Sequence, residues 1–133
     1  MRAVNRPDVL SLIKRLNTEV QLGDENIDST GRLLSDIGGD YSPFTIQESQ
    51  RKGRAKKGSD RIDLHDTGEF WESFFVKVDN NGIDIEADTI KDGEDLRDSW
   101  GENIIGLTEK SLEIVRDKIL QNYQEELRKE LGL

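Results

Sequence analysis

Residues 74–87 read Phe-Phe-Val-Lys-Val-Asp-Asn-Asn-Gly-Ile-Asp-Ile-Glu-Ala, and this stretch decides the fold. Apolar and polar residues alternate in both halves, which is the pattern of strands that bury one face. Asn81-Gly82 separates the halves and favours a tight turn, because both residue types tolerate positive φ. The stretch therefore predicts an antiparallel hairpin with one apolar and one charged face, covered on one side only.

Two longer segments have the apolar spacing of amphipathic helices, and both are expected to pack on the hairpin. The first is Pro7–Leu22, where Pro7 suits the first turn and Gly23 is the expected stop. The second follows Thr108, which can cap a helix of about 22 residues. Its wide apolar stripe predicts burial on more than one side. The stripe consists of Leu112, Val115, Ile119, Tyr123, Leu127 and Leu131, widened by Ile114 and Leu120.

Two shorter helices are expected on either side of the hairpin. One begins near Thr67 and carries the aromatic cluster Phe70, Trp71, Phe74 and Phe75, which we expect in the core. The other is Asp92–Trp100, with Gly101 as its stop. The residues Trp100, Ile104 and Ile105 are either core or an exposed interface patch, and the pattern alone leaves both open.

Together these patterns predict an α+β fold, with N-terminal and long C-terminal helices packed on a small antiparallel sheet centred on the 74–87 hairpin. A length of 133 residues suits one domain spanning 1–133. Residues at about 50–61 are almost devoid of apolar side chains and predict an exposed basic loop.

Composition excludes several classes of function. Hydrophobic residues make up 33% of the chain and charged residues 35%, so much of the surface faces water or partner proteins. The lack of cysteine excludes thiolate metal sites and cysteine nucleophiles, and fits synthesis in a reducing cytoplasm. One histidine excludes a multi-histidine metal site within one chain. No membrane-spanning run or cofactor motif is visible, so we expect no cofactor, no membrane and no small-molecule substrate.

The charge is unevenly distributed along the chain. The net charge of −9 argues against a general nucleic-acid binder, yet residues 50–61 hold six bases and one acid. Residues 86–133 hold thirteen acids and seven bases. The basic run can pair with the acidic surface of another copy, or contact nucleic acid through phosphates. Its candidate contact residues are Arg51, Lys52, Arg54, Lys56, Lys57 and Arg61.

The turn Asp66-Thr67-Gly68 matches the tripeptide that aspartic proteases use in pairs to activate water. Those enzymes have a small residue after the tripeptide and an apolar strand before it, whereas here Glu69 follows and His65 precedes. We therefore interpret the turn as a helix start, with Asp66 or Thr67 as the N-cap, and expect no enzyme activity.

In the order of these features the chain resembles small structural proteins of tailed bacteriophages of Bacteroidetes-type hosts, distantly like phage minor-tail and tail-completion (neck) proteins. The resemblance covers about residues 17–120. Its strings are Asp60-Arg61-Ile62-Asp63-Leu64-His65-Asp66-Thr67-Gly68-Glu69-Phe70, Ser73-Phe74-Phe75, the hairpin, and Trp100-Gly101-Glu102-Asn103-Ile104-Ile105-Gly106-Leu107-Thr108. Upstream, Tyr41-Ser42-Pro43-Phe44-Thr45-Ile46 and Lys52-Gly53 also match.

The resemblance implies a structural role in the virion, in a protein made in the bacterial host cytoplasm. Such proteins form oligomeric rings at the head–tail junction, as neck, connector or tail-completion proteins. The implied partners are further copies of the chain and the portal, connector or tail subunits, with DNA nearby. The alternative from the residues themselves is a nucleic-acid-binding phage accessory protein that uses the basic run 51–61.

Overall fold

The computed structural model describes residues 5–38, 64–65, 68–79, 82–91 and 93–132. The basic run 51–61, Asp66 and Thr67 lie outside the described residues, so the expectations for them stay predictions.

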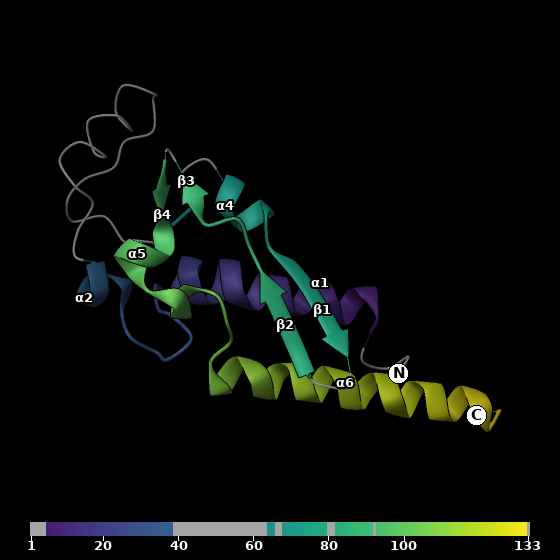
Figure 1. Ribbon diagram of the computed structural model, residues 1–133. Helices are drawn as coiled ribbons and strands as arrows, with labels where there is room; N and C mark the ends of the chain where they lie inside the picture. The colour runs from purple at the N-terminus through teal and green to yellow at the C-terminus, as the bar shows by residue number, and fades with distance from the viewer. Residues whose placement is uncertain (1–4, 39–63, 66–67, 80–81, 92, 133) are drawn as a thin grey trace.

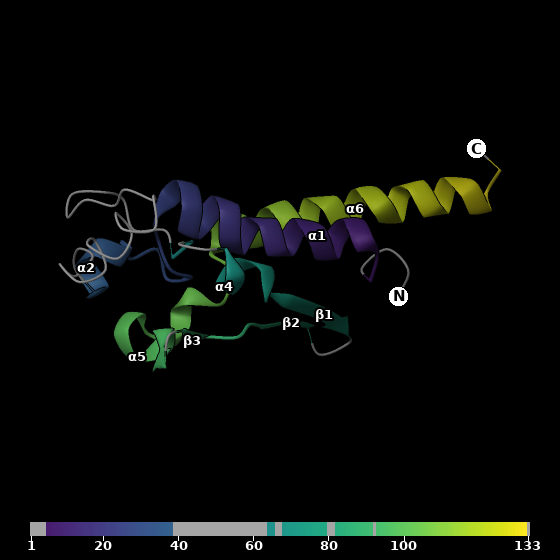
Figure 2. The ribbon, with the colours of Figure 1, turned by 90° about the horizontal axis from the view of Figure 1, so that it is seen from above.

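The described elements form a helical layer and a second layer of strands and short helices (Figures 1 and 2). In chain order they are α1 (Pro7–Arg15), η1 (Leu16–Glu25), α2 (Leu34–Gly38), α4 (Glu69–Glu72), β1 (Phe75–Asp79), β2 (Gly82–Glu86), β3 (Ile90–Lys91), β4 (Glu94–Asp95), α5 (Leu96–Trp100), η2 (Glu102–Ile104) and α6 (Glu109–Glu130). α6 runs antiparallel to α1 in the helical layer and continues past the N-terminus of α1.

The α+β fold is confirmed, and the hairpin lies where the alternating pattern predicts it. The turn predicted at Asn81-Gly82 is wrong by one residue, because Gly82 pairs with Asp79 and is the first residue of β2. β1 and β2 are antiparallel, with Val76 opposite Ile85 and Val78 opposite Ile83. Val76 is buried, whereas Lys77 and Asp84 on the other face are exposed. This two-stranded sheet is therefore covered on one side, as the alternation requires.

Two apolar clusters form the core, and the half-buried Ile85 packs against both. One cluster joins β1 to the two long helices through Val9, Ile13, Leu16, Val76 and Val115. The other joins η1 to α2, α4 and η2 through Leu22, Leu34, Leu64, Phe70, Phe74 and Ile104. The hairpin thus connects the helical layer to the short elements.

The first helix continues beyond its predicted end. From Leu16 to Glu25 it has π-helical hydrogen bonding, and it ends at Asn26, whose φ is 56°. The Asn26 side chain donates to the carbonyl oxygens of Leu22 and Gly23, at 2.9 and 3.1 Å, and satisfies the helix end. The prediction that Gly23 stops the helix is wrong. Gly23 instead gives room to Trp71, because a Cβ there would lie 2.7 Å from Trp71 Cη2.

The aromatic segment is only partly buried. Phe70 and Phe74 pack edge to face, with ring centroids 5.0 Å apart, as their helical spacing predicts. α4 starts after Gly68, which has a φ of 85° and occupies the N-cap position predicted for Asp66 or Thr67. Phe75 is 56% exposed, so its predicted place in the core is wrong. It is the first residue of β1, where alternation turns its side chain to the outer face.

The predicted helix over Asp92–Trp100 is shorter in the structure, since α5 begins at Leu96. The residues before it form a small second ladder, β3–β4, in which Ile90 lies opposite Asp95. Gly93 turns this ladder with a φ of 81°, a conformation that favours glycine. Gly101 ends α5 as predicted.

Asp95 caps α5 by accepting a hydrogen bond from the Arg97 backbone N–H at 3.0 Å. The Arg97 guanidinium also pairs with the Asp95 carboxylate, at 3.2 Å. Hydrogen bonds from the side chains of Arg97 and Thr89 and from the Arg97 backbone lower the pKa of Asp95 to about 2. The carboxylate therefore stays charged, as an N-cap at a positive helix end requires.

α6 spans 22 residues, and Thr108 caps it by accepting from the Ser111 N–H at 3.2 Å, as predicted. The described residues bury only one side of it, however. Val115 and Asn122 on one face are 1% exposed. Leu112 and Ile119 are partly buried, whereas the other large apolar side chains are exposed, namely Ile114 (40%), Leu120 (54%), Tyr123 (58%), Leu127 (43%) and, just past the helix, Leu131 (64%).

Gly23→Ala should destabilise the protein, although alanine normally favours helix over glycine by roughly 1 kcal/mol. The added methyl group would meet the Trp71 ring, and such overpacking costs about 1–3 kcal/mol. Urea unfolding followed by circular dichroism measures the change. Glu19→Ala, at an exposed position of the same helix, is the control and should stay within about 0.5 kcal/mol of the wild type. A Gly23→Ala protein as stable as the wild type would contradict the contact with Trp71.

Candidate functional site

The most specific arrangement in the described structure is a pair of buried side-chain amides that hold the segment before α6. Asn17 and Gln21 are both 0% exposed and lie on η1. Asn17 Nδ2 donates to the Ile104 carbonyl at 3.0 Å, and Asn17 Oδ1 accepts from the Gly106 N–H at 2.8 Å. Gln21 makes the equivalent pair of hydrogen bonds two residues further along the segment, to Gly106 and Thr108. We call these two residues and their four hydrogen bonds the amide clamp.

Gln21 completes the clamp with two further bonds. Its Nε2 donates to the Gly106 carbonyl at 2.8 Å, and its Oε1 accepts from the Thr108 N–H at 2.9 Å. Each amide thus uses both its donor and its acceptor on backbone groups of a segment that belongs to no strand. These buried or partly buried backbone groups thereby obtain hydrogen-bond partners. The clamp fixes the residues that lead from α5 into the N-cap of α6.

A loop after η1 holds the other side of the same segment. The Ser29 N–H donates to the Asn103 carbonyl at 2.8 Å, and a Cβ on Gly106 would lie 3.1 Å from the Ser29 Cβ. Asp28 shapes this loop, because its Oδ1 accepts from the Thr30 and Arg32 N–H groups at 2.9 and 3.1 Å. The connection 103–108 is therefore enclosed by η1 and the loop that follows it.

A polar contact fixes the middle of α6 against the start of α1. Asp8 pairs with Lys118 at 3.5 Å and with Arg6 at 3.2 Å, and Arg6 also reaches Glu125 at 3.6 Å. Asn122, which is buried, faces Asp8 at 3.5 Å. Burial raises the pKa of Asp8, but Arg6, the Val9 N–H and Lys118 together lower it by more than burial raises it. The pKa of Asp8 therefore lies below its ordinary value. The carboxylate therefore remains charged beside these cations.

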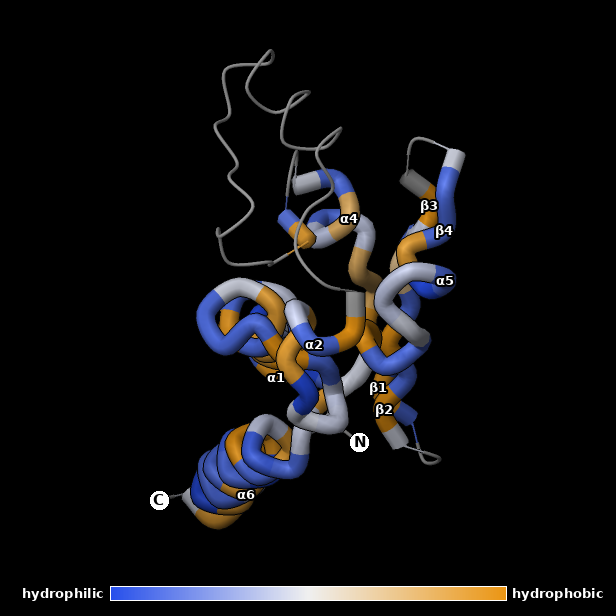
Figure 3. The backbone as a smooth tube through the Cα atoms, turned by 90° about the vertical axis from the view of Figure 1, so that its left-hand side faces the viewer, coloured by the Kyte–Doolittle hydropathy of each residue, from blue (hydrophilic) through white to orange (hydrophobic). Residues whose placement is uncertain are grey.

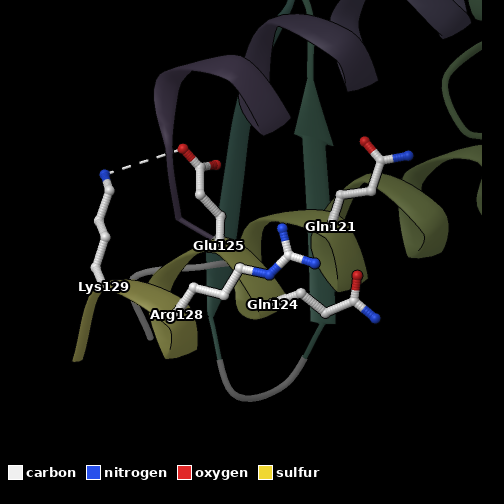
Figure 4. A pocket seen from close by; sticks show the side chains of 5 residues that line it. All are labelled: Gln121, Gln124, Glu125, Arg128 and Lys129. Atoms are coloured by element: carbon white, nitrogen blue, oxygen red, sulfur yellow. Dashed lines mark ion pairs between the residues drawn. The ribbon is translucent and has the colours of Figure 1, made fainter. Parts of the chain in front are cut away.

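The described residues include two concave surfaces, and neither has the residues that an active site requires. One, of about 400 Å³, lies along α6 and is lined by exposed polar side chains from that helix alone (Figure 4). In it Lys129 pairs with Glu125 at 3.9 Å. Its lining is Gln121, Gln124, Glu125, Arg128 and Lys129. A hollow between side chains of one exposed helix does not enclose a substrate.

The other hollow, of about 360 Å³, lies between β2 and the first turn of α6. Its lining is apolar except for Asp84 and consists of Ile83, Asp84, Ile85, Ile105, Gly106, Leu107 and Leu112. The five large apolar side chains in it are only partly buried. We call this surface the β2 groove, and its chemistry suits an apolar side chain of another protein rather than a reaction.

The residues predicted from the sequence fall in different places. Ile104 is fully buried in the core, and Trp100 packs partly buried against the same cluster. Ile105 is also half-buried and lines the β2 groove. Gly68 is buried, and a Cβ on it would lie 3.3 Å from His65 Nε2. The structure thus brings Trp100, Ile104 and Ile105 together at one apolar cluster, and Gly68 lies at the N-terminus of α4.

Sequence reasoning missed Asn17 and Gln21. Their signal was two amides four residues apart, which continue the i, i+4 line of the buried Val9 and Ile13. In a regular α-helix this line drifts away from the buried face, whereas the π-helical winding turns it inward.

The described residues include no cluster of three or more histidine, cysteine, aspartate or glutamate side chains that could hold a metal ion. None of their buried side-chain nitrogen or oxygen atoms lacks a hydrogen-bond partner. Among the described helices, none is both long and apolar enough to cross a membrane. His65 packs edge to face on Trp71, with ring centroids 4.4 Å apart, so an aromatic contact accounts for its position.

Comparisons with known protein families, with curated proteins and with solved structures give no match to this chain.

Asn17→Asp should destabilise the protein at neutral pH by roughly 3 kcal/mol, because a buried carboxylate would replace the amide donor to the Ile104 carbonyl. Protonation restores that donor. The pKa of the new carboxyl is then raised in the folded state, so stability should recover as the pH falls toward the ordinary aspartate pKa of about 4. Thermal unfolding at several pH values measures this.

Asn103→Asp is the matched control, since the Asn103 side chain is exposed in the same segment. It should change stability little at either pH. If Asn17→Asp and Asn103→Asp had the same pH profile, the amide clamp would not contribute as described.

Proposed function

We propose that this protein is a structural protein of tailed-bacteriophage virions, which assembles as an oligomeric ring at the head–tail junction in a neck, connector or tail-completion position. It is made in the host cytoplasm, and its partners are further copies of itself and portal, connector or tail subunits. The role involves no chemical turnover.

The observation that carries this proposal is the kind of surface that the described residues present. Large apolar side chains are exposed along α6, and the β2 groove adds a second apolar surface. Contiguous exposed apolar surface is typical of sites where another protein docks. Neither concave surface combines an enclosed space with a set of titratable groups, which catalysis would require.

The order of the elements supports the placement in a phage virion. Gly68 precedes α4, the β1–β2 hairpin follows, α5 ends at Trp100-Gly101, and α6 comes after it. This order is the one that the resemblance to neck and tail-completion proteins implies. The amide clamp gives the segment after Trp100-Gly101 a physical role, since it sets the start of α6.

The sheet edges and the charge distribution support self-assembly. β1 and β2 pair only with each other among the described strands, so each offers a further edge to a neighbour. A ring requires a heterologous contact, in which two different surfaces of the same protein meet. The basic run 51–61 and the acid-rich residues 86–133 are two such surfaces with opposite charge.

Reversing Arg54, Lys56 and Lys57 to glutamate should abolish ring formation, because like charges would then meet at the contact between copies. Native mass spectrometry and negative-stain electron microscopy of the purified protein measure the assembly. The control reverses Arg15, Arg32 and Lys110, which are exposed bases elsewhere and change the net charge equally. Rings that survive the first triple reversal would refute the role of the basic run.

The same variants test the alternative of a nucleic-acid-binding accessory protein, which the six bases in 50–61 favour. That function predicts binding to DNA that weakens steeply with salt and is lost in the Arg54/Lys56/Lys57 variant, while the assembly state is unchanged. Detection of the protein in purified virions supports the structural role, and its absence from virions contradicts it.

A further inference from the structure

The second half of α6 carries an apolar stripe that nothing in the described chain covers. Its members are 43–64% exposed, although leucine is usually buried. We call it the outer stripe. It consists of Leu120, Tyr123, Leu127 and Leu131.

The outer stripe lies on the side of α6 that faces away from the core. Its residues follow one another at intervals of three, four and four, which keeps them on one helix face. At 3.6 residues per turn this face lies more than a quarter turn from the one that holds Val115 and Asn122. Figure 3 shows hydrophobic segments of α6 on its side away from α1 as well as on the side toward it. The C-terminal part of α6 extends beyond α1 in Figures 1 and 2.

We propose that two copies of this chain pair through the outer stripe, with their α6 helices antiparallel and a two-fold axis close to Tyr123. The two Tyr123 rings then meet at the axis, and Leu120 of each copy packs beside Leu127 of the other. Because the contact is isologous, every favourable pair occurs twice.

Charged side chains in line with Tyr123 and at one border of the stripe favour the antiparallel arrangement. A residue a given number of places before Tyr123 lies opposite the residue the same number of places after it in the second copy. Arg116 and Glu130 are each seven places from Tyr123, so at about 3.6 residues per turn all three lie nearly in line along the helix. At one border of the stripe Asp117 lies opposite Arg128 of the second copy, to within one residue. Both pairs therefore bring opposite charges together.

These four charged side chains are available for such contacts. All are exposed, and no ion pair between described residues of the chain uses them. In a parallel pair in register, by contrast, Arg116 would face Arg116 of the second copy and Glu130 would face Glu130. Like charges that face each other across the contact disfavour the parallel pair. A second copy of the chain thus fits the stripe in one orientation.

The contact goes beyond the proposed function and does not rest on it. A two-fold contact closes on two copies and cannot build a ring, which requires the heterologous contact discussed above. It could join two monomers or two rings. The stripe from Arg116 to Leu131 is roughly 22 Å long, so the interface is small and the pair should dissociate on dilution.

Leu127→Glu tests the pairing in the full chain. Because Leu127 is exposed, the fold should be retained, and circular dichroism checks this. Sedimentation equilibrium should show a dissociation constant for the pair at least about tenfold higher than in the wild type. Ile114→Glu is the matched control, since Ile114 is equally apolar and 40% exposed but lies on another face of α6. It should leave the pair intact. Equal effects of the two variants, or a wild type that stays monomeric at all concentrations, would overturn the proposal.

Two further experiments test the orientation. Arg116→Glu and Glu130→Arg should each weaken the pair, and the double variant should restore it, whereas failure to restore would refute the antiparallel register. Since the chain has no cysteine, Tyr123→Cys provides a single thiol at the proposed axis. Mild oxidation should link it efficiently into a covalent dimer, and Ile114→Cys should not be linked. Linkage at residue 114 in place of 123 would contradict the model of the contact. The Arg54/Lys56/Lys57 reversal leaves this pair unchanged, so failure of the ring and failure of the pair are distinguishable.

Discussion

The amide clamp is the interaction on which the rest of the structure depends. Asn17 and Gln21 project from the first helix and bind backbone groups from Ile104 to Thr108, some 85 residues further along the chain. These groups belong to the segment that joins the short elements to α6. Leaving one of them buried and unpaired costs about 1–3 kcal/mol, so the clamp sets where α6 begins and how it meets the hairpin.

The clamp also explains the winding of η1. A regular α-helix from Pro7 would rotate Asn17 and Gln21 gradually away from the face that holds Val9 and Ile13. The π-helical turns keep them on the inner side, together with Leu22. The same winding brings Gly23 against Trp71 and lets Asn26 end the helix through its side chain. Local regularity is thus given up for contacts between distant segments.

α6 divides into a part that belongs to the core and a part suited to a partner. Its first turns pack Val115 against Ile13 and Val76, and Asp8 with Lys118 fixes its middle. Beyond Asn122 its large apolar side chains are exposed. A helix that is anchored along one half and apolar along the other can present a rigid surface to another protein without further folding. This division fits a structural protein that works through assembly.

The sequence by itself determined the hairpin, the caps at Thr108 and Gly101, and the α+β class, because alternation and capping act between near neighbours. It did not determine that Phe75 faces solvent, that the first helix passes Gly23, or that Asn17 and Gln21 are buried. Those features depend on which distant segment arrives at each side chain. Only the tertiary structure decides that, and it likewise decides which half of the α6 stripe is core and which is surface.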